Sequence, residues 1–542
     1  MNKLLRRSWI FLPVFFLITL VFYWPARHAL LIDDGISILT QFKKQGWSGV
    51  STSFGFTSLY YVHDLICILV FLIVGKSTTG WFLVMTAFHS ANSFFILKIF
   101  RRVYQKLEIR NGFLIAVSGA VLFLVSPYQS ENVAWAATLH YGLSMALLFS
   151  CIWLLLNFLE SGKTVALFLI PCLLGLSLLT LEISIVFPFV LVLIFLLYFL
   201  SGCTQVSLRK FAMNIFLPSV FAVLLYASAT KLLKGSWLPH YGDEHLKNLF
   251  NPALLLKTLS EYSEKIFGFV HYLSFPKREL VYEFSSDYLL TSLILFLATI
   301  SIGYFMFRSG GKKMLYTFSA LCALLIIFLL PVLNMYFMYI FQTENNRLSY
   351  FALVLAFQIL ALVSFGLLKK SGWIVLGIYT AASVIILPHE VTRWAGAAQL
   401  QNAMVSTYKW EKAHRVYILN SPSNFGGAYV FRKDYRFGKA LYFFRDIDAY
   451  KTIDQIAWAN FNSLSDSVKT EKVNDSTLHV ILAAPGSWLM HENLGASPRE
   501  TEWYSFKPDE WNTGYLVLFK QKKPDDVFLY VTSTGLHEVK DF

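Results

Sequence analysis

The stretch LLTLEISIVFPFVLVLIFLLYFL, residues 178–200, contains one charged residue, Glu182, in an otherwise apolar segment. A transmembrane helix needs about 20 consecutive, mainly apolar residues, so the run after Glu182 is long enough to cross a bilayer. Ionisable groups are costly at that depth, and a tight turn between two spans would normally use Gly, Asn or Ser. The lone acid therefore indicates a functional residue more than a simple hairpin turn.

Runs of this kind recur along the chain, which is 56% hydrophobic and only 15% charged. Soluble domains carry about 25% charged residues, so a single soluble globule is excluded, as are disordered and fibrous proteins. The five cysteines lie in or beside apolar runs without CxxC spacing and are expected to be packed thiols. We predict an α-helical polytopic membrane protein with about eleven spans, near 8–25, 80–99, 111–126, 133–158, 164–181, 183–200, 211–231, 288–307, 314–331, 347–368 and 372–388.

The net charge of +13 comes mostly from short basic clusters between apolar runs, which is typical of cytoplasmic loops and not of a nucleic-acid-binding face. The segment 59–75 contains His63-Asp64 and is predicted to lie on the outer surface, because a crossing there would separate 101–110 from the other basic clusters. The N-terminus is then cytoplasmic and the C-terminus extracytoplasmic. A cleaved signal peptide is the alternative for the first span.

Two domains follow from this topology. Residues 1–390 form the membrane module, with outer loops at 26–79 and 232–287. Residues 391–542 have the composition of a soluble domain, with strand-like runs RVYILN, AYVF, LHVILAA, GYLVLF and DVFLYV and a helix predicted at DAYKTIDQIAWANF (448–461). We expect a small α/β or α+β domain on the outer surface.

The acids and bases on the outer side are the candidate functional residues. Asp33-Asp34 directly follow the first span, and paired carboxylates suit a general base or a cation site, although an acidic helix cap is an equal alternative. Glu131 lies in a short turn and could be merely exposed. Arg347 begins a span, where its planar fork suits a phosphate but could also snorkel to the interface.

Histidines offer weaker signals. His89 and His140 are more often hydrogen-bonding residues between helices than ligands, and they have no HxxxH or HExxH spacing. No metal site is predicted from the residue spacing.

These segments, in this order, resemble the GT-C class of membrane glycosyltransferases, and above all the protein O-mannosyltransferases that carry tetratricopeptide repeats. The similar segments are Asp33-Asp34, GWFLVMTAFHSANSFFILKIF (80–100), SPYQSENVAWAA (126–137), LLTLEISIVFP (178–188) and ENNRLSYFAL (344–353). Ser126 and Leu181 stand where the family has His and Lys, and the tail has no 34-residue repeat.

The resemblance implies transfer of a sugar from a polyprenyl-phosphate donor to a hydroxyl of a protein or glycan acceptor, at the outer leaflet of the bilayer. In that reading Asp33 is the base, with Asp34 second, and Glu131, Glu182, His89 and His140 bind sugar or acceptor. The donor phosphate is assigned to Arg347, with Lys231, Lys234 or Arg278 from the long loop. No cofactor is required, although clustered carboxylates would also suit Mg²⁺ or Mn²⁺.

A transporter or lipid-linked-glycan flippase is the rival interpretation, and a scaffold for the outer domain is a weaker one. A transporter would distribute polar residues through its spans, often with internal repeats, whereas here the ionisable residues gather on one side. Compact loops and the absence of retention signals favour a prokaryotic plasma (inner) membrane over the endoplasmic reticulum.

Overall fold

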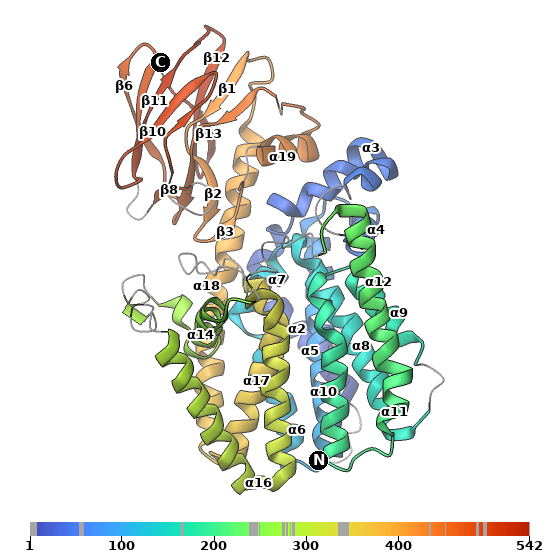
Figure 1. Ribbon diagram of the computed structural model, residues 1–542. Coiled ribbons are helices and arrows are strands. Elements are labelled where there is room, and N and C mark those ends of the chain that lie inside the picture. The colour runs from blue at the N-terminus through green and yellow to red at the C-terminus, as the bar shows by residue number, and fades with distance from the viewer. Residues whose placement is uncertain are drawn as a thin grey trace.

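The computed structural model describes residues 8–53, 59–163, 167–237, 248, 250–273, 277, 280–281, 283, 288–333, 346–432, 435–449, 451–483, 487–490, 496–540 and 542. Its helices form one bundle, and a strand-rich C-terminal domain sits at one end of that bundle, opposite the N-terminus (Figure 1). The long helix α18 (Gly372–Thr407) runs from the bundle into this domain.

Most of the membrane module is helical. Its helices are α2 (Phe11–Tyr23), α3 (Ser37–Ser53), α4 (Tyr61–Val74), α5 (Thr78–Lys106), α6 (Gly112–Leu124), α7 (Ser130–Ala134), α8 (Leu139–Ser161), α9 (Leu169–Leu178), α10 (Phe187–Leu200), α11 (Leu208–Phe211), α12 (Leu217–Lys234), α14 (Pro252–Gly268), α16 (Tyr288–Leu333), α17 (Tyr350–Gly366) and α18.

In the described part of the chain, eight helical segments are long and apolar enough to span a bilayer, or nine if α6 and the bent segment after it count as one. The helix α16 changes direction at Gly311, whose φ of 68° lies in the left-handed region that glycine adopts without strain. A mostly helical chain with several apolar helices of bilayer length is therefore confirmed. The predicted span at 164–181 contains only the ten-residue helix α9 among its described residues, and the count of eleven spans stays a prediction.

The basic clusters gather at the end of the bundle away from the C-terminal domain. A hollow of about 1020 Å³ there is lined by residues of all three loops, among them Arg110, Lys313 and Lys370. Lys313 pairs with Glu108 at 2.7 Å. The three basic clusters, from 101–110, 308–313 and 369–370, thus lie together at one end of the bundle. This is the arrangement expected if the segment 59–75 does not cross the bilayer.

Helix α4 has both of its ends at the other end of the bundle. Near its start, the backbone N–H of Val62 donates to Leu179 O at 3.1 Å. Just beyond its end, the Lys76 ammonium lies 5.5 Å from the ring centroid of Phe443 in the C-terminal domain. α4 therefore does not run the length of the bundle.

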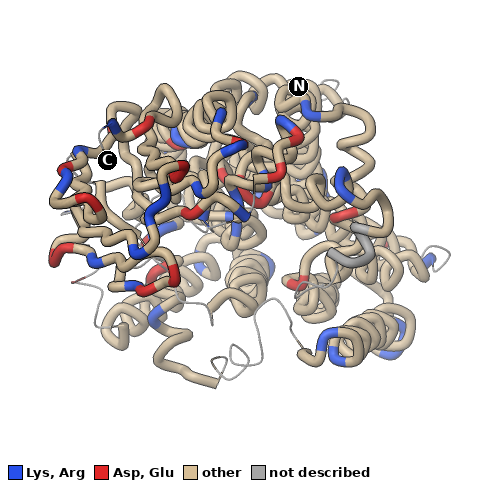
Figure 2. Tube along the Cα trace, turned by 90° about the horizontal axis from the view of Figure 1, so that it is seen from above, with Lys and Arg blue, Asp and Glu red and all other residues tan. Residues whose placement is uncertain are grey.

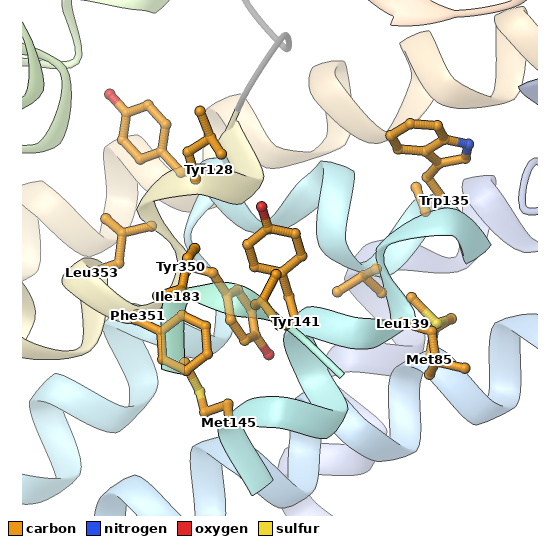
Figure 3. Packing of buried hydrophobic residues seen from close by; sticks show 14 of the residues in the cluster. Met85, Tyr128, Trp135, Leu139, Tyr141, Met145, Ile183, Tyr350, Phe351 and Leu353 are labelled. Carbon is orange, nitrogen blue, oxygen red and sulfur yellow. The ribbon is translucent and has the colours of Figure 1, made fainter. Parts of the chain in front are cut away.

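Buried aromatic and aliphatic side chains fill the interior between the helices (Figure 3). Tyr141 of α8 and Tyr350 of α17 pack edge to face there, with ring centroids 6.4 Å apart. Seen from the end that carries the C-terminal domain, charged residues are dense over that domain, while long parts of the helical trace carry none (Figure 2). This contrast is expected where helices face lipid and a domain faces water.

The C-terminal domain contains three sheets, and all described strands come from residues 415–538. Its strands are β1 (Arg415–Ile418), β2 (Ser421–Phe425), β3 (Ala428–Tyr429), β4 (Ile453–Gln455), β5 (Trp458–Phe461), β6 (Val468–Asn474), β7 (Thr477–Leu482), β8 (Trp488–Met490), β9 (Arg499–Glu500), β10 (Tyr504–Pro508), β11 (Gly514–Phe519), β12 (Asp526–Thr532) and β13 (Gly535–Glu538). The strand orders are β13-β12-β1-β4, β3-β2-β5-β8 and β6-β7-β11-β10-β9.

The five predicted strand runs all contain strands, but the predicted helix at 448–461 is wrong. This stretch forms β4 and β5, which pair in parallel with β1 and β2. Strand β5 is buried along its whole length, so its apolar run has no alternation to distinguish it from a helix. Among the described residues of this domain, a helix forms instead at α19 (Tyr435–Arg445), where none was predicted from the sequence.

Candidate functional site

Asp33 and Asp34 begin a short 3-10 helix, Asp33–Ile36, between α2 and α3. The preceding turn is fixed by the bundle, because Trp135 Nε1 donates to Ile32 O at 3.0 Å and Gln401 Nε2 donates to Leu31 O at 2.8 Å. Asp33 has a φ of 44°, in the left-handed region that Asp and Asn tolerate better than most residues. Its side chain is fully buried, whereas that of Asp34 is 35% exposed.

Two arginines of the C-terminal domain bind this acidic pair. Arg432 Nε lies 2.8 Å from Asp33 Oδ2, and its Nη2 lies 2.5 Å from Asp34 Oδ2. Arg436, in the first turn of α19, pairs with Asp34 through Nη2 and lies 3.5 Å from Asp33 through Nε. Arg436 also donates to Ser37 Oγ. Each guanidinium therefore bridges both carboxylates.

Electrostatics follow from this arrangement. Burial would raise the pKa of Asp34, but Arg432, Arg436 and Lys439 hold that pKa below its usual value. Burial and the neighbouring Arg436 lower the pKa of Lys439 to about 8. Asp34 is thus favoured in its ionised form, and the cations beside it repel one another.

A second acid–arginine pair joins α7 to the start of α17. Glu131 is fully buried on α7, and its Oε2 accepts from the Arg347 backbone N–H at 2.8 Å. Arg347 Nη1 donates to Glu131 Oε1. The sequence alternative of a merely exposed turn residue is wrong for Glu131, because the turn forms a buried short helix.

Trp135 and Tyr429 connect the two pairs. The guanidinium carbon of Arg347 lies 5.7 Å from the Trp135 ring centroid, and that of Arg432 lies 5.4 Å from the same ring. Arg432 also stacks on Tyr429 at 3.8 Å, while Arg347 makes a side-chain hydrogen bond with Tyr429. Asp33, predicted to be the base, and Arg347, predicted to bind phosphate, therefore belong to one site.

Lys265 is a residue of this site that sequence reasoning missed. It lies on α14, is fully buried, and its ammonium is 5.6 Å from the Tyr128 ring centroid. Burial lowers the pKa of Lys265 to about 7, with Glu131 acting to raise it and Arg347 to lower it. Helix α14 is anchored by the Tyr128 hydroxyl on Lys265 O and by the Tyr379 hydroxyl on Ile266 O at 2.5 Å. No local motif marks Lys265, because its role depends on where the long loop docks.

The long-loop cations named from sequence lie elsewhere or outside the described residues. Lys231 and Lys234 end α12, where the Lys231 ammonium bonds Gly235 O at 2.7 Å. Arg278 lies outside the described residues. Their assignment to the donor phosphate stays a prediction.

Glu182 and the two histidines are placed as follows. Glu182 is buried and accepts from the Tyr226 hydroxyl of α12 at 3.2 Å. His140 stacks on Tyr60 and lies next to Tyr141, which hydrogen-bonds Arg347. His89 is buried deeper in the bundle.

The His89 ring bonds Leu124 O at 3.2 Å and the Tyr350 hydroxyl at 3.4 Å. Asn92, one turn further along α5, donates to the same hydroxyl at 3.3 Å. These contacts match the interhelical alternative and place His89 beneath Tyr350, three residues after Arg347.

Within the described residues, no group of three or more His, Cys, Asp or Glu side chains could hold a metal ion. The arrangement offers carboxyl groups, several fixed guanidiniums and aromatic faces, which together suit a polar ligand with both hydroxyl and phosphate groups. Comparisons with models of known protein families and with curated proteins find no match to this chain.

Proposed function

We propose that this protein is a membrane glycosyltransferase that moves a sugar from a polyprenyl-phosphate donor to a hydroxyl acceptor on the extracytoplasmic side. The observation that carries the proposal is the meeting of Asp33 and Arg347 in one site. They lie 314 positions apart in the chain. The Arg347 guanidinium lies against the Trp135 ring, and so does the guanidinium of Arg432, which pairs with Asp33.

The chemistry of such a transfer matches these groups. The acceptor hydroxyl needs a base, for which Asp33 and the more exposed Asp34 are the candidates. When the bond between the sugar carbon and the phosphate oxygen breaks, its electron pair stays on that oxygen and the phosphate gains negative charge. Fixed cations rather than a proton donor would stabilise this charge. Arg347 fills that role, with Glu131 holding its guanidinium in place.

A small apolar pocket lies among the helices near the start of α17. An apolar pocket between α5, α8, α10, α16 and α17 is lined by residues that include Phe351 and Leu355. Phe351 follows Tyr350, one helical turn beyond Arg347. The pocket has a volume of only about 60 Å³, less than the 150 Å³ or so of a cavity that holds benzene, so a polyprenyl chain would enter it only if the surrounding helices move apart.

The proposed topology has about eleven crossings. The two arms of α16 count separately, and the short helix α9 and the bent α6 are included. The N-terminus and the basic hollow are cytoplasmic, because Lys and Arg are retained on that side. The site and the C-terminal domain then face the extracytoplasmic side of a plasma membrane, with α4 on the outer surface.

The test is release of free polyprenyl phosphate by the purified protein in lipid nanodiscs, from a polyprenyl-phosphate sugar, after an acceptor is added. We expect acceptor-dependent release that stops in the Asp33→Asn variant. A flippase would move the intact donor between leaflets without releasing phosphate, and that outcome would reject the transferase. Mass spectrometry of the glycans lost on gene deletion would then identify the acceptor.

A further inference from the structure

The hollow of about 1020 Å³ lies at the end of the bundle opposite the C-terminal domain, away from the candidate site. Residues of three segments line it: the turn between α5 and α6 (107–114), the bend of α16 (305–314) and the turn between α17 and α18 (365–373). The structure describes each of these segments without a gap. The proposed sugar transfer does not use this hollow, so its chemistry needs a separate explanation.

The lining of this hollow is strongly basic. Among the described residues that line it, five are cations and one, Glu108, is an acid. The cations are Arg110, Arg308, Lys313, Lys369 and Lys370. Glu108 pairs with Lys313 at 2.7 Å, which leaves four of the five cations without an acid among the lining residues. A concave wall of one charge sign concentrates its electric field, so an anion is drawn into the hollow.

Two contacts hold the three segments close together. The pair of Lys313 and Glu108 joins the bend of α16 to the turn after α5. The Ser309 hydroxyl donates to Gly366 O at 2.6 Å and joins the same bend to the end of α17. Gly366 permits this close approach, since a Cβ there would lie 3.2 Å from Met306 Sδ. The cations therefore come from segments that are held within side-chain reach of one another.

The hollow also has an apolar part, and it lies where apolar helices end. Helices α5 and α17 end beside it, and α6 and α18 begin there, so it lies at the depth of lipid headgroups if these helices span a bilayer. Leu114, Phe305 and Phe365 share the lining with the cations. Trp373 packs against Phe365 with ring centroids 4.8 Å apart. Phe305 and Trp373 are both more than half exposed, so a lipid beside the bundle reaches the same hollow.

We propose that this hollow binds the headgroup of an anionic phospholipid, with Arg308, Lys369 and Lys370 on its phosphate and Phe305 and Trp373 against its glycerol and acyl chains. Basic pockets between the ends of membrane helices bind lipids of this class. A headgroup with net negative charge, such as that of phosphatidylglycerol, fits the excess of cations. Phosphatidylcholine carries its own ammonium beside the phosphate, which the same cations repel.

The experiment measures lipid binding to the full chain in detergent by native mass spectrometry. The probes are dioleoyl phosphatidylglycerol, dioleoyl phosphatidylcholine and, as a lipid-free competitor, glycerol 3-phosphate. The double variant Arg308→Gln/Lys370→Gln removes two cations of the hollow. Lys163→Gln/Arg209→Gln is the matched control, because Lys163 after α8 and Arg209 on α11 are exposed at the same end of the bundle and do not line the hollow. Glu108→Gln removes the acid and tests for a change of opposite sign, which misfolding would not produce.

We expect the wild type to bind phosphatidylglycerol about tenfold or more tightly than phosphatidylcholine. Each Lys or Arg beside an anionic lipid changes the affinity about fivefold, so Arg308→Gln/Lys370→Gln should weaken phosphatidylglycerol binding about 25-fold. The control should bind as the wild type does, and Glu108→Gln should bind about fivefold more tightly.

Equal losses in the two double variants would overturn the proposal, because general surface charge would then explain the binding. Equal affinity of the wild type for the two lipids, or no gain in Glu108→Gln, would also overturn it. Displacement of the lipid by an equal concentration of glycerol 3-phosphate would show that a soluble phosphate, and not a lipid, is the ligand. The hollow and the candidate site lie at opposite ends of the bundle, so failure here leaves the transferase proposal standing.

Discussion

The site combines two acid–arginine groups that are built differently. Glu131 and Arg347 both belong to the membrane module, and their contact joins α7 to the segment just before α17. Asp33 and Asp34 belong to the membrane module as well, but their arginines come from the C-terminal domain, about 400 positions away in the chain. The first group can form as the bundle packs, whereas the second forms only when the domain is seated.

The Glu131–Arg347 pair thus joins parts of the bundle to each other, whereas the group around Asp33 and Asp34 joins the C-terminal domain to the bundle. Breaking a buried ion pair leaves an uncompensated charge, which costs far more than losing an exposed pair. The docking of the C-terminal domain should therefore depend on the ion pairs of Asp33 and Asp34 with Arg432 and Arg436. The following experiments are designed to break or sharpen this contrast.

The largest expected effect is on stability. Replacing Arg432 and Arg436 together by Ala leaves the buried Asp33 without its cations and should lower the free energy of unfolding by about 3–5 kcal/mol. Thermal unfolding measures the loss, and proteolysis in the region after α18 should speed up as the domain undocks. Adding Asp33→Asn should recover part of the loss, because no buried charge is then left unpaired. A loss no larger than that of Lys472→Ala, which removes an exposed pair, would contradict interdomain clamping.

Asp33→Asn alone should have the next largest effect, on turnover rather than stability. If Asp33 is the base, transfer falls by about 10²–10⁴-fold, the usual contribution of a general base. Folding is retained because Asp34 still binds both arginines. Turnover of a labelled donor by Asp33→Asn and Asp34→Asn, side by side, tells which carboxylate acts. Near-normal rates in the Asp33 variant would remove it as the base.

Arg347→Ala tests the group inside the membrane module. Donor binding should weaken about 10- to 100-fold, because a charge-assisted contact to phosphate is lost, while acceptor binding changes little. Isothermal titration with each substrate separates the two effects. The donor affinity of the conservative Glu131→Gln variant should lie between those of Arg347→Ala and the wild type, because this substitution only weakens the contact that holds the Arg347 guanidinium. Unchanged donor affinity in Arg347→Ala would defeat the phosphate role.

The smallest expected effect is a pH dependence at Lys439. Its pKa is about 8 in the folded protein, against about 10.4 for an unfolded lysine. Between these values the unfolded chain binds one more proton, so this lysine makes stability rise with pH across that window. Melting curves of the wild type and Lys439→Gln should therefore converge as the pH is raised from 7 towards 10. A constant difference between the two would show that Lys439 is not perturbed.

Much of the membrane module could be predicted because apolar run length is a local property. The runs around α5, α8, α10 and α17 form helices where expected, and the basic clusters meet at one end. The same reasoning failed at 448–461, since a buried parallel strand and a buried helix share an unbroken apolar pattern. Helix α19 was missed for the opposite reason: nothing local distinguishes its mixed sequence from a loop.

The sequence by itself determined that the chain has a bundle of bilayer-length apolar helices and that Asp33, Asp34, Glu131 and Arg347 stand out as ionisable residues beside them. Their cost in an apolar setting makes such residues visible without any structure. Only the tertiary structure decided which cations face the acids. Arg432, Arg436, Lys439 and Lys265 look like ordinary surface residues in the sequence, because a charge reveals its role only through the partner that packing places beside it.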